Sequence, residues 1–96
     1  MSDVTVLVLP TRFDFQHHVE FTKSYDDFIA NAAATTLQLN FSQVTYLDTS
    51  ALGMLMLLAK KHRASGAGGD LEIIGAQGSC REMLVIANMS DYFNIK

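Results

Sequence analysis

The sequence predicts an α/β fold in which helices pack on a mostly parallel central sheet. Apolar, β-branched runs alternate along the chain with segments whose apolar residues recur at the helical period. The connections between these segments are short, and strands that alternate with helices form parallel sheets with right-handed crossovers. A chain of 96 residues has room for one hydrophobic core, so residues 1–96 are expected to form a single domain.

The first strand is predicted over residues 4–9, an apolar and β-branched run that stops at Pro10. The alternating residues 13–15 predict a short piece of strand or a turn. A helix is then predicted from about residue 18 to about residue 33, because apolar side chains recur on one of its faces. The residues on this face are Phe21, Tyr25, Phe28, Ile29 and Ala32.

The middle of the chain predicts two strands and a second helix. Residues 35–40 alternate between polar and apolar, and residues 44–47 form a further short strand after a polar interruption. A polar turn follows, and the next helix is expected to run to about residue 64. The glycine-rich residues 65–69 are a strong stop signal for that helix.

The last part of the chain predicts a strand, a helix and a final short strand. The apolar residues 71–74 form the first of these strands, and residues 92–95 form the second. Between them, Ser79 and Glu82 have the spacing of a capping box. Ser79 is therefore expected to cap a helix that runs to about residue 88.

Composition and charge disfavour several classes of function. The net charge is −3, and the basic cluster at 60–63 lies at a predicted helix end, so no nucleic-acid binding is expected. The longest apolar run, residues 51–59, is far shorter than the ~20 residues that cross a bilayer. The N-terminus lacks a signal-peptide pattern, and the one cysteine, Cys80, fits a reducing compartment. We expect a cytoplasmic protein that does not bind membranes.

The sequence predicts a binding protein and not an enzyme. No glycine-rich phosphate loop follows a predicted strand, so no nucleotide cofactor is expected. His17 and His18 are adjacent and cannot share a helix face, which disfavours a metal site. Ser50 follows a strand, as the nucleophile of many hydrolases does, but the glycines of a nucleophile elbow are missing around it. A hydrolase that uses Ser50 is the weakest of the alternatives.

The most informative segment is 44–53, in which a strand ends in a polar turn and enters a helix. Asp48, Thr49 and Ser50 lie at this junction, close to the backbone N–H groups that open the helix. These groups favour negative charge, so the turn is suited to gaining or losing a phosphate. The spacing alone leaves a simpler interpretation open, in which Asp48 or Thr49 caps the helix and Ser50 is a solvated first-turn residue.

Residues 46–53, Tyr-Leu-Asp-Thr-Ser-Ala-Leu-Gly, resemble the phospho-acceptor segment of the STAS domain family, in particular of bacterial anti-sigma factor antagonists. The resemblance extends over residues 4–95, and residues 69–74 are similar to the glycine-rich turn and fourth strand of the family. It implies a small STAS-like domain in which Ser50 is phosphorylated, with Thr49 as the close competitor.

The resemblance also implies a function. An anti-sigma factor, or a related serine kinase of the ATPase type, would be bound while Ser50 is unphosphorylated, which releases a sigma factor. Phosphorylation would block this binding, and a serine phosphatase would restore it. The alternative is an accessory STAS subunit of an ABC-type lipid or solute transporter, in which the same surface holds an ATPase.

The resemblance and the predicted helix face together define an expected partner surface. Asp14, just after the first strand, is similar in position to an acidic residue near the phosphosite of the family. Met54 is placed on the exposed face of its helix, because Leu52 and Leu55 are expected to face the sheet. The residues expected at the partner surface are Asp14, Asp48, Thr49, Ser50, Ala51, Gly53 and Met54. One strand is predicted before the first helix, where family members often have two.

Overall fold

The computed structural model describes residues 4–30, 36–65 and 69–96. Its strands are β1 (Val4–Val8), β2 (Arg12–Phe13), β3 (Thr36–Asn40), β4 (Tyr46–Leu47), β5 (Asp70–Ile74) and β6 (Asn94–Ile95). Its helices are α1 (His18–Ala30), α2 (Thr49–Ser65) and α3 (Gly78–Ile86), with short 3-10 helices η1 (Phe15–His17) and η2 (Met89–Asp91).

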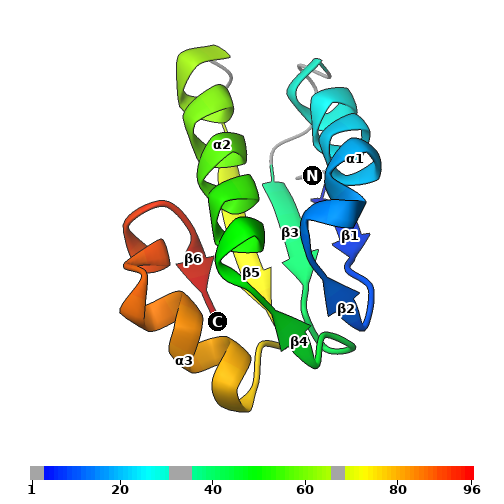
Figure 1. Ribbon diagram of the computed structural model, residues 1–96. Coiled ribbons are helices and arrows are strands. Elements are labelled where there is room, and N and C mark those ends of the chain that lie inside the picture. Colours follow the sequence, from blue (N-terminus) through cyan, green and yellow to red (C-terminus); the bar gives the residue numbers. More distant parts are fainter. Residues whose placement is uncertain (1–3, 31–35, 66–68) are drawn as a thin grey trace.

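The main sheet has four parallel strands in the order β1-β3-β5-β6, and each strand is joined to its neighbour in the sheet through a helix. The predicted α/β fold is therefore confirmed. Helices α1 and α2 lie side by side across one face of this sheet, and α3 lies near the ends toward which the strands point (Figure 1). Within the described ranges, no helix combines the length and the apolar character that crossing a membrane requires.

A second, two-stranded parallel sheet is formed by β2 and β4. The carbonyl oxygen of Thr11 accepts hydrogen bonds from the N–H groups of Thr45, at 2.8 Å, and Tyr46, at 3.2 Å, which draws the two segments together. Phe13 is completely buried and anchors β2 to the core. A second strand therefore precedes the first helix, close to residues 13–15, where the sequence predicts a short piece of strand or a turn.

The core lies between the main sheet and the helices. Leu37 and Leu39 of β3 are in register with Leu71 and Ile73 of β5, and all four side chains are buried. Alternation along a strand directs these side chains to one face, which is the face that the helices cover. Edge-to-face aromatic contacts extend this core toward β2. The ring pairs are Phe13–Phe21 at 5.1 Å, Phe21–Tyr25 at 5.2 Å and Phe13–Phe41 at 6.2 Å.

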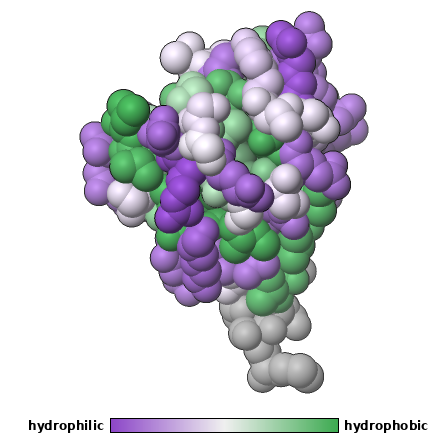
Figure 2. Space-filling view, turned by 90° about the horizontal axis from the view of Figure 1, so that it is seen from below, coloured by the Kyte–Doolittle hydropathy of each residue, from purple (hydrophilic) through white to green (hydrophobic). Residues whose placement is uncertain are grey.

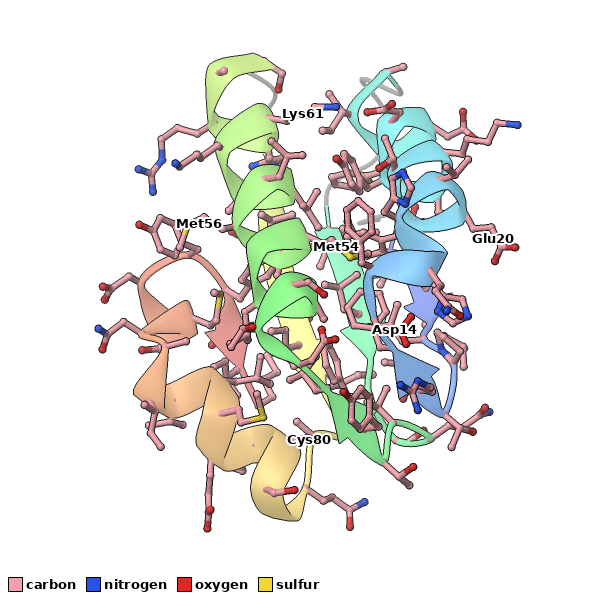
Figure 3. The ribbon with its side chains drawn as sticks, viewed as in Figure 1. Asp14, Glu20, Met54, Met56, Lys61 and Cys80 are labelled. Atoms are coloured by element: carbon pink, nitrogen blue, oxygen red, sulfur yellow. The ribbon has the colours of Figure 1, made fainter. Side chains whose placement is uncertain are left out.

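The predicted exposure of Met54 is wrong, because its side chain is 8% exposed and its sulfur lies between α2 and α1 (Figure 3). Leu52, predicted to face the sheet, is only partly buried. The buried positions of α2 are Ala51, Met54, Leu55, Leu58 and Ala59. Their spacing is that of a regular apolar face, rotated from the predicted one because α2 packs against α1 as well as against the sheet.

The predicted capping box at Ser79 is also wrong. Helix α3 begins at Gly78, so Ser79 lies inside its first turn, and the capping residue Gln77 makes no side-chain hydrogen bond to the helix. Before this helix the chain turns at Gly75, whose φ is 76°. A side chain there would also place its Cβ 3.0 Å from the backbone nitrogen of Ser42.

The remaining helix and strand boundaries agree with the predictions to within about two residues where they can be compared. The expected end of the first helix near residue 33, with Ala32 on its apolar face, lies outside the described residues. So do residues 66–68 of the predicted stop signal. The final strand is shorter than predicted, because Tyr92 and Phe93 form the turn that follows η2 and only Asn94 and Ile95 pair with β5.

Candidate functional site

Asp48 caps helix α2 and fixes the hydroxyl of Ser50. Its Oδ1 accepts hydrogen bonds from the backbone N–H of Ala51, at 2.9 Å, and from the Ser50 hydroxyl, at 2.7 Å. The backbone N–H of Leu52 donates to the Asp48 carbonyl oxygen at 3.2 Å, which begins the helical ladder. Of the two capping residues that the sequence left open, the cap is therefore Asp48. Ser50 remains exposed in the first turn.

Asp14 occupies the equivalent position on the neighbouring strand. Arg12 is in register with Tyr46, and Phe13 with Leu47, so Asp14 follows β2 as Asp48 follows β4. The two strands are parallel, so the two carboxylates follow the same end of the small sheet, and each precedes a helical segment. The structure thus brings together two acidic residues that are far apart in the sequence.

Hydrogen bonds hold the Asp14 carboxylate, which is 5% exposed. Its Oδ2 accepts from Nε of Arg12 at 2.7 Å, and its Oδ1 accepts from the backbone N–H of Gln16 at 3.0 Å. Nδ1 of His17 lies 3.4 Å from the same Oδ1. The guanidinium of Arg12 also lies over the ring of Tyr46, with 4.3 Å between Cζ and the ring centroid. Asp14 and Tyr46 together fix the position of this cation beside the α2 turn.

These contacts lower the pKa of both carboxyl groups. The hydrogen bond from Ser50 lowers the pKa of Asp48 most, followed by the bond from the Ala51 backbone, against smaller opposing effects of burial and of the Asp14 charge. The hydrogen bond from Arg12 is the largest cause of the lowered pKa of Asp14, and burial opposes it. Both groups are therefore ionised at neutral pH, and the turn carries two negative charges beside the exposed hydroxyl of Ser50.

The cap predicts a pH-dependent contribution to stability. Because the pKa of Asp48 in the folded protein lies below its ordinary 3.8, its carboxylate stabilises the fold above about pH 3.8. This contribution is lost as the pH falls through the lowered pKa. We expect Asp48→Ala to lower the Tm at pH 7, and we expect the difference from wild type to shrink toward about pH 2.5. Thermal melts of the wild type and Asp48→Ala at both pH values measure this difference, and Asp27→Ala, at an exposed aspartate of α1, is the control. A Tm difference that is the same at both pH values would contradict the prediction.

The other residues of the predicted partner surface divide into exposed and buried ones. Thr49 and Gly53 are exposed, and a side chain added at Gly53 would meet no atom within 4 Å. Ala51 is completely buried and Met54 nearly so, which leaves neither side chain free on the surface. The exposed part of the site is thus the outer side of the first α2 turn.

The sequence analysis missed residues that surround this turn. Arg12 comes to the site only through the pairing of β2 with β4, which has no local sequence signal. Tyr46, in β4, is 42% exposed, and Phe15, two residues after β2, is 58% exposed. The Phe15 ring stacks on His18 with centroids 4.3 Å apart. The face of the molecule that is seen from below combines hydrophilic side chains with hydrophobic patches at its edges (Figure 2).

Comparisons with known proteins find relatives of this chain in sequence and in fold. The chain is 33% identical over 84 residues to a STAS-domain containing protein of Pseudomonas aeruginosa, covering 88% of this chain and 79% of that one. Its fold is similar to that of a proposed anti-sigma factor antagonist of Thermotoga maritima, with a TM-score of 0.77, 21% identity and coverage of 99% and 80% of the two chains.

A second fold likeness is to the anti-sigma factor antagonist SpoIIAA of Bacillus. The unphosphorylated form gives a TM-score of 0.73 and the phosphorylated form 0.67, each at 16% identity over the whole of this chain and 82% and 85% of SpoIIAA. The family described as "Mlab, STAS domain" matches residues 1–95. Because that match spans nearly the whole chain and the Pseudomonas relative is a STAS protein, the chain belongs to the STAS domain family.

Proposed function

We propose that this STAS domain is an anti-sigma factor antagonist whose binding is switched by phosphorylation of Ser50. The observation that supports this most directly is the exposed Ser50 hydroxyl at the start of α2, 2.7 Å from the carboxylate that caps the helix. Unphosphorylated, the domain would bind an anti-sigma factor or a related serine kinase of the ATPase type and thereby release a sigma factor. A regulator of this kind acts in the cytoplasm.

The chemistry of the turn explains how a phosphate would act as a switch. Transfer from ATP joins the phosphorus to Oγ of Ser50, releases ADP and removes the hydroxyl proton. The hydrogen bond that Ser50 donates to Asp48 is then lost, and roughly −1.5 to −2 charges are added beside a carboxylate. The N–H groups of the first helical turn offset part of this repulsion. The fold would persist while the charge of the exposed surface changes.

The partner roles follow from this scheme. The domain would be the substrate of a kinase and of a phosphatase and would catalyse no reaction itself. The Bacillus protein of similar fold is known in phosphorylated and unphosphorylated forms, which shows that this fold can hold such a modification in that protein. In the present chain, the aromatic rings of Tyr46 and Phe15 beside the turn are of the kind that anchors protein interfaces.

Phosphate mapping tests the assignment of the phosphosite. After incubation with ATP and the kinase recovered by affinity capture, we expect mass spectrometry to place the phosphate on Ser50. Ser50→Ala should abolish the incorporation, and Thr49→Ala should retain it, because the Ser50 hydroxyl is the one held by Asp48. Phosphate on Thr49 of the wild-type protein, with Ser50 unmodified, would refute the assignment.

Affinity capture decides between the two kinds of partner. An anti-sigma factor or its kinase, recovered with the wild type and identified by mass spectrometry, supports the proposal. Recovery of a transport ATPase would instead assign the domain to the second candidate, an accessory subunit of an ABC-type lipid or solute transporter. Both candidates use the exposed first turn of α2, so the identity of the captured protein separates them where the site alone does not.

A further inference from the structure

We propose that Arg12 is the intramolecular counter-ion of the phosphate on Ser50, held in position by Asp14 and Tyr46. The inference rests on the proposed phosphorylation of Ser50 and adds the residue that receives the new charge. Arg12 belongs to β2, outside the strand-to-helix turn, and the contacts of its side chain support this role.

The pairing of the small sheet brings Arg12 to the phosphosite. Its Cα is in register with that of Tyr46, two residues before Asp48. The guanidinium lies over the Tyr46 ring, with its Cζ 4.3 Å from the ring centroid, and it donates from Nε to Asp14 at 2.7 Å. Its charge is also close enough to Asp48 to contribute to the lowered pKa of that carboxyl.

The donors of Arg12 are only partly used. Within the described ranges, its one hydrogen bond comes from Nε, and the side chain is 65% exposed. The two Nη groups therefore remain available to an acceptor in solvent or on a neighbouring residue. A guanidinium fixed by Nε and by stacking presents these groups as a preorganised fork, which matches two oxygens of a phosphate.

A phosphate on Ser50 requires such a donor. The modified residue has three acceptor oxygens and no proton to give to Asp48, so the present 2.7 Å contact becomes repulsive. Among the described residues, the polar contacts at and beside the turn involve Asp48, Asp14, His17 and Arg12, and of these four side chains Arg12 is the permanent cation. Bridging the phosphate and Asp14, it would offset part of the negative charge of the modified turn.

Titration of the phosphate tests this without depending on any kinase. The protein is produced with phosphoserine genetically encoded at position 50, and the second pKa of the phosphate is measured by ³¹P NMR. We expect this pKa to rise by about half a unit or more in Arg12→Gln, because the charge that favours the dianion is removed. Arg12→Lys should recover part of the shift, since it keeps the charge but not the fork.

Arg63 provides a matched control. It also lies over a tyrosine ring, with its Cζ 5.5 Å from the centroid of Tyr92, but it belongs to the last turn of α2. Arg63→Gln should leave the phosphate pKa unchanged. Equal phosphate pKa values in wild type and Arg12→Gln would overturn the proposal.

A second measurement uses the wild-type side chain itself. The Nε and Nη signals of Arg12 should shift and exchange more slowly when phosphoserine replaces serine at position 50, whereas those of Arg63 should not. This keeps the proposal testable if Arg12→Gln destabilises the fold by weakening the contact with Asp14. Unchanged Arg12 signals would overturn it. Failure of the kinase to modify Ser50 would instead refute the proposed function and leave this result standing.

Discussion

Ser50→Asp is expected to abolish partner binding and to leave the domain folded. The substituted carboxylate lies at the first turn of α2, where the helix dipole favours negative charge by ~0.3–1 kcal/mol and offsets the repulsion from Asp48. At an interface, an unpaired charge that must lose its water costs several kcal/mol, which corresponds to a loss of affinity of ~100-fold or more. Calorimetric titration with the captured partner measures the affinity, and thermal melting measures the fold.

Two variants separate charge from shape at this position. Ser50→Asn has nearly the volume of the aspartate but no charge, and it should retain most of the affinity. Ser50→Ala removes the 2.7 Å hydrogen bond to Asp48 and cannot be phosphorylated, so it should bind the partner constitutively. If Ser50→Asp binds as tightly as Ser50→Asn, charge at this residue is not the switch.

Leu55→Ala is expected to lower the Tm by about 10 °C or more, or to unfold the domain. Leu55 is completely buried in α2 against the core. Truncating such a side chain costs ~2–5 kcal/mol, because apolar contacts are lost and a cavity remains. A domain of this size has a stability of about 5–15 kcal/mol, so the loss is a large fraction of the total.

Neighbouring residues of α2 provide the comparison. Leu57 is 48% exposed, and Leu57→Ala removes the same atoms with little change expected in Tm. Met54, 8% exposed beside α1, should behave like Leu55 and not like a surface residue. Thermal melts of the three variants rank them, and a Leu57→Ala protein that melts as low as Leu55→Ala would show that this face of the helix is assigned incorrectly.

The layered α/β fold could be predicted because its signals are local. The change from alternating residues in the segment 36–40 to a helical period after Ser50 appears within a few residues of sequence. The exposure of Met54 could not be predicted in this way, because it depends on where α1 packs beside α2. The same hydrophobic period is compatible with two helix faces that differ by a small rotation. The packing of the neighbouring elements determines which of these faces is buried.

In the candidate site, too, features of a single turn could be predicted from the sequence, whereas contacts between distant segments could not. The cap and the exposure of Ser50 are properties of one turn, whose sequence predicts the exposure and limits the cap to Asp48 or Thr49. The position of Asp14 followed from the family resemblance. Arg12 and Tyr46 form their contact across two strands that are distant in the sequence, so no periodicity or spacing rule reveals it. Contacts that are set by strand register can be identified only once the fold is known.

The parallel arrangement of the sheet also determines how the chain can reach its native state. Val4 pairs with Thr36, and Thr36 pairs with Asp70, so a whole helix separates the partners in each ladder. No tight hairpin nucleates these pairings, and the entropy of closing a long loop must be overcome before the first ladder forms. During synthesis, the central strand β3 obtains both of its neighbours only after β5 has left the ribosome. The core around β3 can therefore be completed only after the C-terminal half of the chain has been synthesised.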